Sequence, residues 1–335
     1  MVFLKGIGAL LLTLAGFSVF SLKLPAGTRA MRGLANAAVA TFLVEAIFQY
    51  ICGAFLRIPF LEQVGAASGT MGGVAAAALV GLAMGTEPVY AVAGAAAVSG
   101  FGILPGFLAA YGTHFVLKHT VRRLPKGLDV ILGALLAAAL ARAVAVAVDP
   151  AVNSVISMVG RSISIATEQS PVMMGLVLGG LMKMICTSPL SSMALTAMLG
   201  LTGLPMGIAA IACFGGSFTN GVVFRRLKLG RQGTVLAVML EPLTQADVIT
   251  KNPIPIYGSN FFGGALSGVV AAMLGIINNA PGTASPIPGM LAPFAFNPPG
   301  KVALALVLAA AGGTAAGFAG STVFQKLGFG RKAES

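Results

Sequence analysis

The sequence has very little charge for its length. Only 9% of its 335 residues are charged, nine residues are acidic, and 57% are hydrophobic, which gives a mean hydropathy of +0.93. A soluble domain could not bury that much apolar surface. The composition therefore excludes a soluble globular protein.

Cysteine and histidine are scarce as well. Cys52, Cys186 and Cys213 stand in apolar segments at unrelated spacings, which indicates neither a disulfide framework nor a metal site. His114 and His119 have no third ligand nearby, and we interpret them as residues of the membrane interface. Because a nucleophile–base pair and a nucleotide-binding loop are also missing, we predict no enzyme activity and no cofactor.

Apolar segments fill the chain instead. A spanning helix needs about 20 mostly apolar residues, and such stretches recur with no soluble-looking interval between them. The sequence thus predicts an all-α polytopic membrane protein with a single transmembrane domain over residues 1–335 and about eight to ten transmembrane helices. Its 45 glycines and 18 prolines favour broken helices or re-entrant segments among them.

Basic residues outnumber acidic ones by 21 to 9, which gives a net charge of +12. Fourteen of them fall in four short clusters at the ends of apolar segments, so we interpret the excess as a topology signal and predict no nucleic-acid partner. The positive-inside rule places all four clusters, and with them the C-terminus, in the cytoplasm. The clusters are Lys23, Arg29 and Arg32; Lys118, Arg122, Arg123 and Lys126; Arg225, Arg226, Lys228 and Arg231; and Lys326, Arg331 and Lys332.

Five ionisable residues lie within apolar segments: Glu45, Glu87, Glu241, Arg142 and Lys183. An ionisable group inside a span is costly, so each is a candidate for a functional role. For Glu87 and Glu241 we favour contact with a ligand. For Glu45 and Arg142 we favour pairing between helices, and Glu45, Lys183 and Arg142 are the candidates for pairing or ion coupling.

An internal repeat is indicated by two similar segments that begin at Met71 and Met174. Thr86 corresponds to Thr187 and Pro88 to Pro189, an offset of 101 residues. The same offset defines repeat A at about 35–127 and repeat B at about 128–231, followed by C-terminal helices at about 232–335. Because both copies end at a basic cluster, the repeat is predicted to be parallel. Similar Gly/Ala-rich composition is the alternative explanation.

In each copy an apolar segment ends at a Thr-x-Pro triplet, and only about 15 small residues follow before the next Leu-Pro. This is too short for an upright span and a turn, and it predicts a re-entrant hairpin or a broken helix. The free amides at the start of a half-helix would face a cavity and suit a hydroxylated or anionic ligand. A proline-kinked pair of ordinary helices is the alternative.

The C-terminal third contains two proline-rich stretches, KNPIPIYGSN at 251–260 and NNAPGTASPIPGMLAPFAFNPPG at 278–300. We expect neither to be a regular helix, so they would be extramembrane loops or buried irregular backbone. Their amides and hydroxyls would suit a sugar or polyol. These side chains are Asn252, Ser259, Asn260, Asn278, Asn279, Thr283 and Ser285.

The segment GTEPVYAV at 85–92 resembles the Gly-x-Thr-Glu-Pro signature of enzyme IIC, the sugar-translocating subunit of the bacterial phosphotransferase system. With TSPLSS at 187–192 and NPIPIYGSN at 252–260, the whole chain resembles the stand-alone IIC-like family that includes the perfringolysin regulator. The resemblance implies a bacterial inner-membrane protein in which Glu87 contacts a sugar. The chain has no room for the IIA and IIB domains that phosphorylate the sugar, so separate IIA and IIB partners would be needed.

The leading hypothesis is a sugar or polyol transporter that works by alternating access, with solute bound between the two repeats. Two alternatives stay open: a secondary transporter coupled to H⁺ or Na⁺ for a small polar or anionic solute, and a membrane regulator that senses a solute. Small-residue faces such as GGTAAGFAG at 312–320 permit a homodimer, and membrane lipid is the remaining partner. The proposed solute-binding residues are Glu87, Thr86, Thr187, Ser188, Asn252, Asn260 and Glu241.

Overall fold

A computed structural model describes residues 8, 12, 15–16, 19–125, 127–188 and 192–329. In this part of the chain fourteen α-helices and short π- and 3₁₀-helical segments account for the regular structure, and no strand is present. The predicted all-α polytopic class is therefore confirmed. The predictions for Lys126, Arg331, Lys332, the Pro189–Ser191 part of the second triplet and the C-terminus lie outside the described residues.

Among the described residues, five helical segments are long and apolar enough to cross a membrane. A sixth span is possible if α3 and α4, which meet at an angle of 59°, are counted as one bent helix. The other apolar segments form shorter helices such as α5 (Pro88–Ala97) and α8 (Pro171–Thr187). The five segments are Gly27–Tyr50, which begins with α2 (Gly27–Ala38), α7 (Asp129–Gln169), α10 (Gly203–Arg226), α13 (Pro253–Met273) and α15 (Pro299–Lys326); the bent pair is α3 (Pro59–Thr70) and α4 (Gly72–Met84).

The chain forms two compact units. Residues 11–160 with 197–200 make up one, called the N-terminal unit here. Residues 161–196 and 201–335, with 1–10, make up the C-terminal unit. Helix α7 contributes residues to both units.

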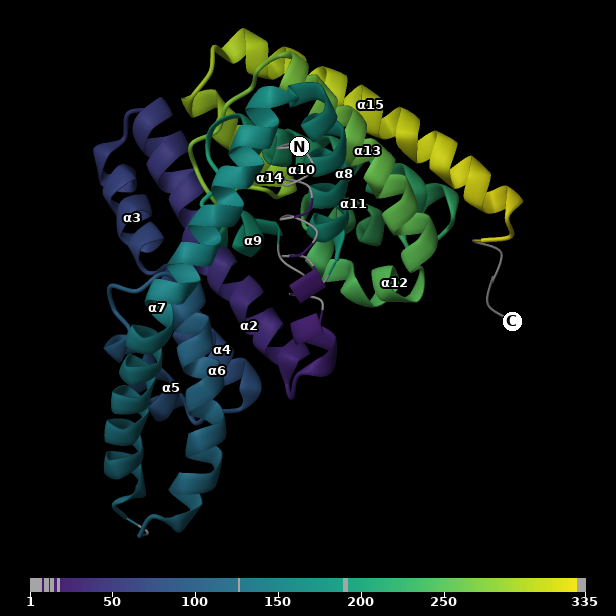
Figure 1. The fold of residues 1–335 in the computed structure, drawn as a ribbon. Helices are drawn as coiled ribbons and strands as arrows, with labels where there is room; N and C mark the ends of the chain where they lie inside the picture. The colour runs from purple at the N-terminus through teal and green to yellow at the C-terminus, as the bar shows by residue number, and fades with distance from the viewer. Residues whose placement is uncertain are drawn as a thin grey trace. The chain divides into compact units, whose positions relative to one another are not determined.

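Three helices of the N-terminal unit run back and forth beside one another: α4, α5 and α6 (Ile103–Thr120) (Figure 1). Gly106, near the start of α6, packs on the backbone of Gly73, near the start of α4, so these two helices are parallel. Ala91 of α5 lies against Gly81 of α4, so α5 returns antiparallel along α4. The break at residues 85–87 therefore forms the tip of a helical hairpin.

The C-terminal unit is built around α13, which packs against α8, α10 and α15 (Figure 1). Its closest contact is with α8, where Gly264 and Gly268 lie directly on the backbone of Gly175 and Gly179. Two small residues four positions apart on each helix let the backbones touch, a geometry that stabilises helix pairs in membranes.

The run GGTAAGFAG on α15 packs within the chain. Gly313 lies against Gly215 of α10, and Gly320 lies against Ser259 of α13. Gly313 and Gly320 therefore both contact other helices of the same chain, so they supply no argument for a dimer. The homodimer stays a prediction.

The expectation that the first proline-rich stretch is not a regular helix is wrong. Residues 253–260 form the first turns of α13, with Pro253 at its first position. A proline is tolerated there because the first turn of a helix has no internal partner for its amide groups. Asn252 is the residue that precedes the helix.

The second proline-rich stretch forms buried irregular backbone followed by the short helix α14 (Pro286–Leu291). The side chains of Asn278 and Thr283 are fully buried and hydrogen-bonded to each other at 2.8 Å. The amide of Asn278 donates to the carbonyl of Gly203, and Gly289 packs on Ala210, so the stretch lies along the first half of α10. Of the two alternatives, the structure favours buried backbone over an extramembrane loop.

The same order of elements occurs in α4–α5–α6 and in α8–α9–α10, where α9 is Ser192–Met198. The short middle helix is followed within three residues by a glycine with positive φ in both, Gly100 at 88° and Gly200 at 57°. The long third helix then begins with Leu-Pro in both. These local features agree with the internal repeat, which stays a prediction.

Candidate functional site

The tip between α4 and α5 holds the Thr-Glu-Pro triplet. Gly85 ends α4 in the left-handed conformation, with φ of 92°, and the amide of Thr86 donates back to the carbonyl of Gly81 at 2.9 Å. This is the hydrogen-bond pattern of a glycine-terminated helix, and a side chain at position 85 would strain it. Glu87 follows in extended conformation, and Pro88 takes the first position of α5. The turn thus presents Thr86 and Glu87 side by side at the start of a new helix.

A cavity of about 380 Å³ opens at this tip. Glu87 is exposed in it, and within the described residues its carboxylate makes no hydrogen bond or ion pair. Three cations line the same cavity: Arg29 from α2, Lys118 from the last turn of α6, and Arg122 from the 3₁₀ turn Val121–Arg123 that follows. The carboxylate of Glu87 therefore faces a polar, positively charged cavity rather than the apolar surroundings that the sequence suggested.

Thr86 is fixed by a residue from the neighbouring helix. Its Oγ1 lies 2.8 Å from Nδ1 of His114 in α6, so the two side chains share a hydrogen bond whose donor depends on the histidine tautomer. The His114 side chain is 9% exposed. The buried hydroxyl of Thr113 lies in the same region and has no hydrogen-bond partner among the described residues. Thr113 lines a small space next to the cavity rather than the cavity itself.

Tyr90 forms the base of the cavity, one turn into α5. Its hydroxyl donates to the carbonyl of Asp129 at 3.2 Å, and its ring lies directly on Gly133, where any side chain would overlap it. Tyr90 thereby connects the first turn of α5 to the start of α7. The arrangement fixes the half-helix that carries Glu87.

The charges of the cavity suit two kinds of ligand group. A carboxylate beside a hydroxyl accepts hydrogen bonds from vicinal hydroxyls of a polyol, and hydrogen bonds to a charged acceptor are stronger than neutral ones. The three cations and the free amides at the start of α5 attract a negative group. The cavity can thus bind a neutral hydroxylated solute at Glu87 and a negatively charged group on its basic side.

The positions of the cations also bear on topology. Arg29 of the first basic cluster lies with Lys118 and Arg122 of the second, at one end of the N-terminal unit. In the C-terminal unit Gln325, beside Lys326 of the fourth cluster, donates to the carbonyl of Arg226 in the third at 2.9 Å. Within each unit the clusters therefore share one end, as the positive-inside prediction requires.

Arg142 lies at the opposite end of α5 from the cavity. Its Nη1 donates to the carbonyls of Ala97 and Ser99 at 3.0 Å each, and its guanidinium stacks on the ring of Phe101 at 4.6 Å. These carbonyls end α5 and have no partner within the helix. The structure therefore favours the pairing role for Arg142.

We predict that Arg142→Gln lowers the stability of the protein by about 1 to 2 kcal/mol, because it removes charged hydrogen bonds from the C-terminus of α5. The measurement is the thermal unfolding midpoint in mild detergent. Arg32→Gln is the matched control, since Arg32 is exposed on α2 and no described residue bonds to it. Equal midpoints for the two variants would contradict the capping role.

The predicted site residues do not form one cluster. Only Thr86 and Glu87 line the cavity of the N-terminal unit, and Glu45 of that unit lies apart, with its carboxylate against Gly69 and hydrogen-bonded to Tyr50. Arg142 of the same unit lies at the other end of α5. The remaining predicted residues belong to the C-terminal unit, and most bond to their own helix or to a neighbouring one. Three of them donate to a backbone carbonyl three or four residues earlier: Thr187 to that of Lys183, Ser188 to that of Ile185, and Asn252 to that of Val248. The side chain of Asn260 donates to Oδ1 of Asn220 at 2.6 Å. The carboxylate of Glu241 accepts from the hydroxyl of Ser285 at 3.3 Å.

Lys183 is the most deeply buried charged residue of the C-terminal unit, with no exposed surface. Its alkyl chain lies on Gly216 and Gly264, and its Nζ donates to the carbonyl of Cys213 at 3.5 Å. Glycines on both neighbouring helices make room for it. Its role in coupling or ligand binding stays a prediction.

Sequence reasoning missed five residues of the cavity. Tyr90 and His114 were not proposed for it, and Arg29, Lys118 and Arg122 were interpreted only as topology signals. A signal existed for two of the cations, since Lys118 and Arg122 stand at the end of α6, the second helix after the Thr-Glu-Pro triplet. The contact between Thr86 and His114 joins residues 28 positions apart, and no pattern in the sequence predicts it.

Comparison with known families adds an independent result. The model of the family described as "Phosphotransferase system, EIIC" matches residues 28–334, nearly the whole chain. No curated protein and no solved structure matches the chain. The chain therefore belongs to this EIIC family and is a multi-pass membrane protein of the sugar-transport class.

Proposed function

We propose that the Glu87 cavity is the solute-binding site of a sugar-translocating EIIC protein that works by alternating access. The observation that carries the proposal is the unpaired carboxylate of Glu87 beside the Thr86–His114 pair in an open cavity. Family membership supports the solute class, and the cavity supports the position of the site.

The proposed chemistry is hydrogen bonding to vicinal hydroxyls. Glu87 accepts from one or two hydroxyls of the solute, and Thr86 is oriented toward the cavity by His114. Each bond to the carboxylate is stronger than a neutral one. Binding would therefore favour solutes with several adjacent hydroxyl groups, such as sugars and polyols.

Phosphorylation would come from separate partners. We propose that IIA and IIB proteins supply the phosphoryl group, as membership of the EIIC family implies, and that the basic side of the cavity faces them in the cytoplasm. The homodimer predicted from the small-residue faces remains part of this proposal and needs a mass measurement in lipid.

A second candidate is transport of a small anionic solute without phosphorylation. Three cations against one carboxylate in the cavity support it, since they would stabilise a bound carboxylate or phosphate. The fully buried Lys183, or Glu45 or Glu241, would then be the candidates for ion coupling.

Thermal-shift measurements on the purified protein distinguish the two candidates. The probes are hexoses, disaccharides and polyols on one side and small carboxylates and sugar phosphates on the other, at two pH values and with or without Na⁺. Stabilisation by neutral sugars alone is expected for the first candidate. Stabilisation by anions alone, with dependence on Na⁺ or pH, would replace it with the second.

A further inference from the structure

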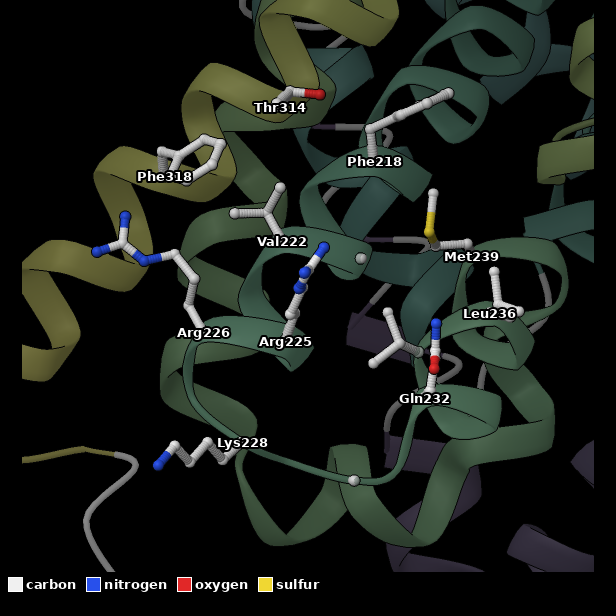
Figure 2. A pocket seen from close by; sticks show the side chains of 13 residues that line it. Phe218, Val222, Arg225, Arg226, Lys228, Gln232, Leu236, Met239, Thr314 and Phe318 are labelled. Carbon is white, nitrogen blue, oxygen red and sulfur yellow. The ribbon is translucent and has the colours of Figure 1, made fainter.

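A second hollow, of about 910 Å³, lies in the C-terminal unit between α10, α15 and α11 (Gln232–Leu240). Its walls are apolar and include Phe218 and Val222 of α10, Leu236 and Met239 of α11, and Phe318 of α15. Figure 2 shows these side chains around the hollow, with the cations Arg226 and Lys228 at one side of it and Arg225 between Val222 and Gln232. We call this hollow the basic-edged groove.

Two of the three helices that form the groove, α10 and α15, are long and apolar enough to cross the bilayer. Its apolar side chains are open to the surroundings: Leu236 is 58% exposed and Phe318 is 50% exposed. Apolar walls at membrane depth do not hold water, because it would find no hydrogen-bond partners there. We therefore expect a hydrocarbon chain to occupy the space between these apolar walls.

The edge of the groove carries a fixed positive charge. Arg226 is held in place, with its guanidinium 5.2 Å from the centre of the Phe318 ring and 3.5 Å from Oε1 of Gln325. Arg225 and Lys228 are exposed, and no described residue forms a hydrogen bond or ion pair with either side chain. None of the described residues that line the groove is acidic. Two cations are therefore available to a negatively charged group.

We propose that the basic-edged groove binds one anionic phospholipid of the cytoplasmic leaflet. An acyl chain lies along Val222 and Phe318, and the phosphate lies at Arg225 and Lys228, where the last turn of α10 reaches the predicted cytoplasmic surface. Basic pockets beside spanning helices bind such headgroups, and each cation near the membrane surface contributes to the attraction.

The charge favours a lipid over a second copy of the chain. In a two-fold symmetric contact centred on the groove, the cations of one copy would lie close to the same cations of the other, with no acidic side chain among the described lining residues to offset them. An anionic lipid meets them with the opposite charge. The site is independent of the proposed solute cavity, which belongs to the N-terminal unit.

The chain contains no tryptophan, so one introduced tryptophan reports on a single position. We would place it in the groove as Leu236→Trp, reconstitute the protein in phosphatidylcholine vesicles, and measure quenching by brominated phosphatidylglycerol or brominated phosphatidylcholine. Quenching by brominated phosphatidylglycerol is expected to saturate at a lower lipid fraction. Val307→Trp on α15 is the control, because Val307 is exposed but lies outside the groove, and both lipids should quench it equally.

Charge variants test the headgroup contact. Adding Arg225→Gln or Lys228→Gln to Leu236→Trp is expected to reduce the preference for phosphatidylglycerol about fivefold in each case. Lys326→Gln is the matched control, since this lysine follows the groove residues on α15 and does not line the groove. The unsubstituted protein should also retain phosphatidylglycerol in native mass spectrometry, which tests the proposal without any variant.

Three outcomes would overturn the proposal. Equal quenching of Leu236→Trp by both lipids would mean that the groove takes any acyl chain. A preference unchanged by Arg225→Gln and Lys228→Gln would remove the headgroup site. Absence of quenching by either lipid, with Val307→Trp quenched normally, would mean that protein covers the groove, a second copy included.

Discussion

Replacement of Glu87 by glutamine is expected to weaken solute binding by about 1.5 to 3 kcal/mol, or roughly one to two orders of magnitude. Glutamine keeps the size of the side chain and one acceptor oxygen but removes the charge that strengthens hydrogen bonds from solute hydroxyls. The fold should be unaffected, because Glu87 is exposed and makes no side-chain cap to α5. Titration of the stabilising probe from the thermal-shift panel gives the dissociation constants.

Glu62→Gln is the matched control for this prediction. Glu62, like Glu87, is an exposed glutamate near the start of a helix of the N-terminal unit, but it does not line the cavity. Its replacement should leave binding unchanged. If Glu87→Gln binds as tightly as wild type yet loses the pH dependence of transport, Glu87 carries a coupling proton; if binding, transport and pH profile are all unchanged, it is a structural residue.

Gly268→Ala is expected to destabilise the C-terminal unit by about 1 to 3 kcal/mol or more. A Cβ at this position would overlap the carbonyl oxygen of Gly175 and approach the backbone of Gly179. Neither neighbour is a flexible side chain, so α8 and α13 would have to move apart along their whole contact. The measurement is the thermal unfolding midpoint and the fraction of monodisperse protein in detergent.

Gly312→Ala is the control that isolates this effect. Gly312 lies in α15, where the atom nearest to a new Cβ is Leu266 Cβ at 3.6 Å, an ordinary contact. Alanine has a higher helix propensity than glycine by about 1 kcal/mol, so this variant should be as stable as wild type or more stable. Equal losses of stability in both variants would show that backbone contact between α8 and α13 is not the cause.

The sequence allowed the membrane class and the break before α5 to be predicted, because both depend on local patterns. Apolar length decides what can span a bilayer, and Gly85 with Pro88 ends one helix and starts the next. Thr86 and Glu87 followed from their place at that break. The proposal for these two residues therefore needed no knowledge of the rest of the fold.

The rest of the cavity depends on contacts between helices. Nothing in the spacing indicates that α6 runs parallel to α4, yet this brings His114 to Thr86. The error at Pro253 and Pro255 has a different cause: composition was read without regard to position, and prolines that break a helix interior are accepted in its first turn. The small-residue run of α15 was predicted only to permit a homodimer, and its contacts with α10 and α13 depend on the fold of the whole chain.

Helix α5 has its two ends in different environments, and this has a mechanical consequence. One end carries Glu87 at an open cavity, and the other is attached to α7 through Arg142. A helix of ten residues is a stiff rod about 15 Å long. Tyr90 also attaches the Glu87 end to α7. A shift of this part of α7 would therefore carry α5 and Glu87 with it as one rod, so solute affinity would change without any change in the side chains of the site.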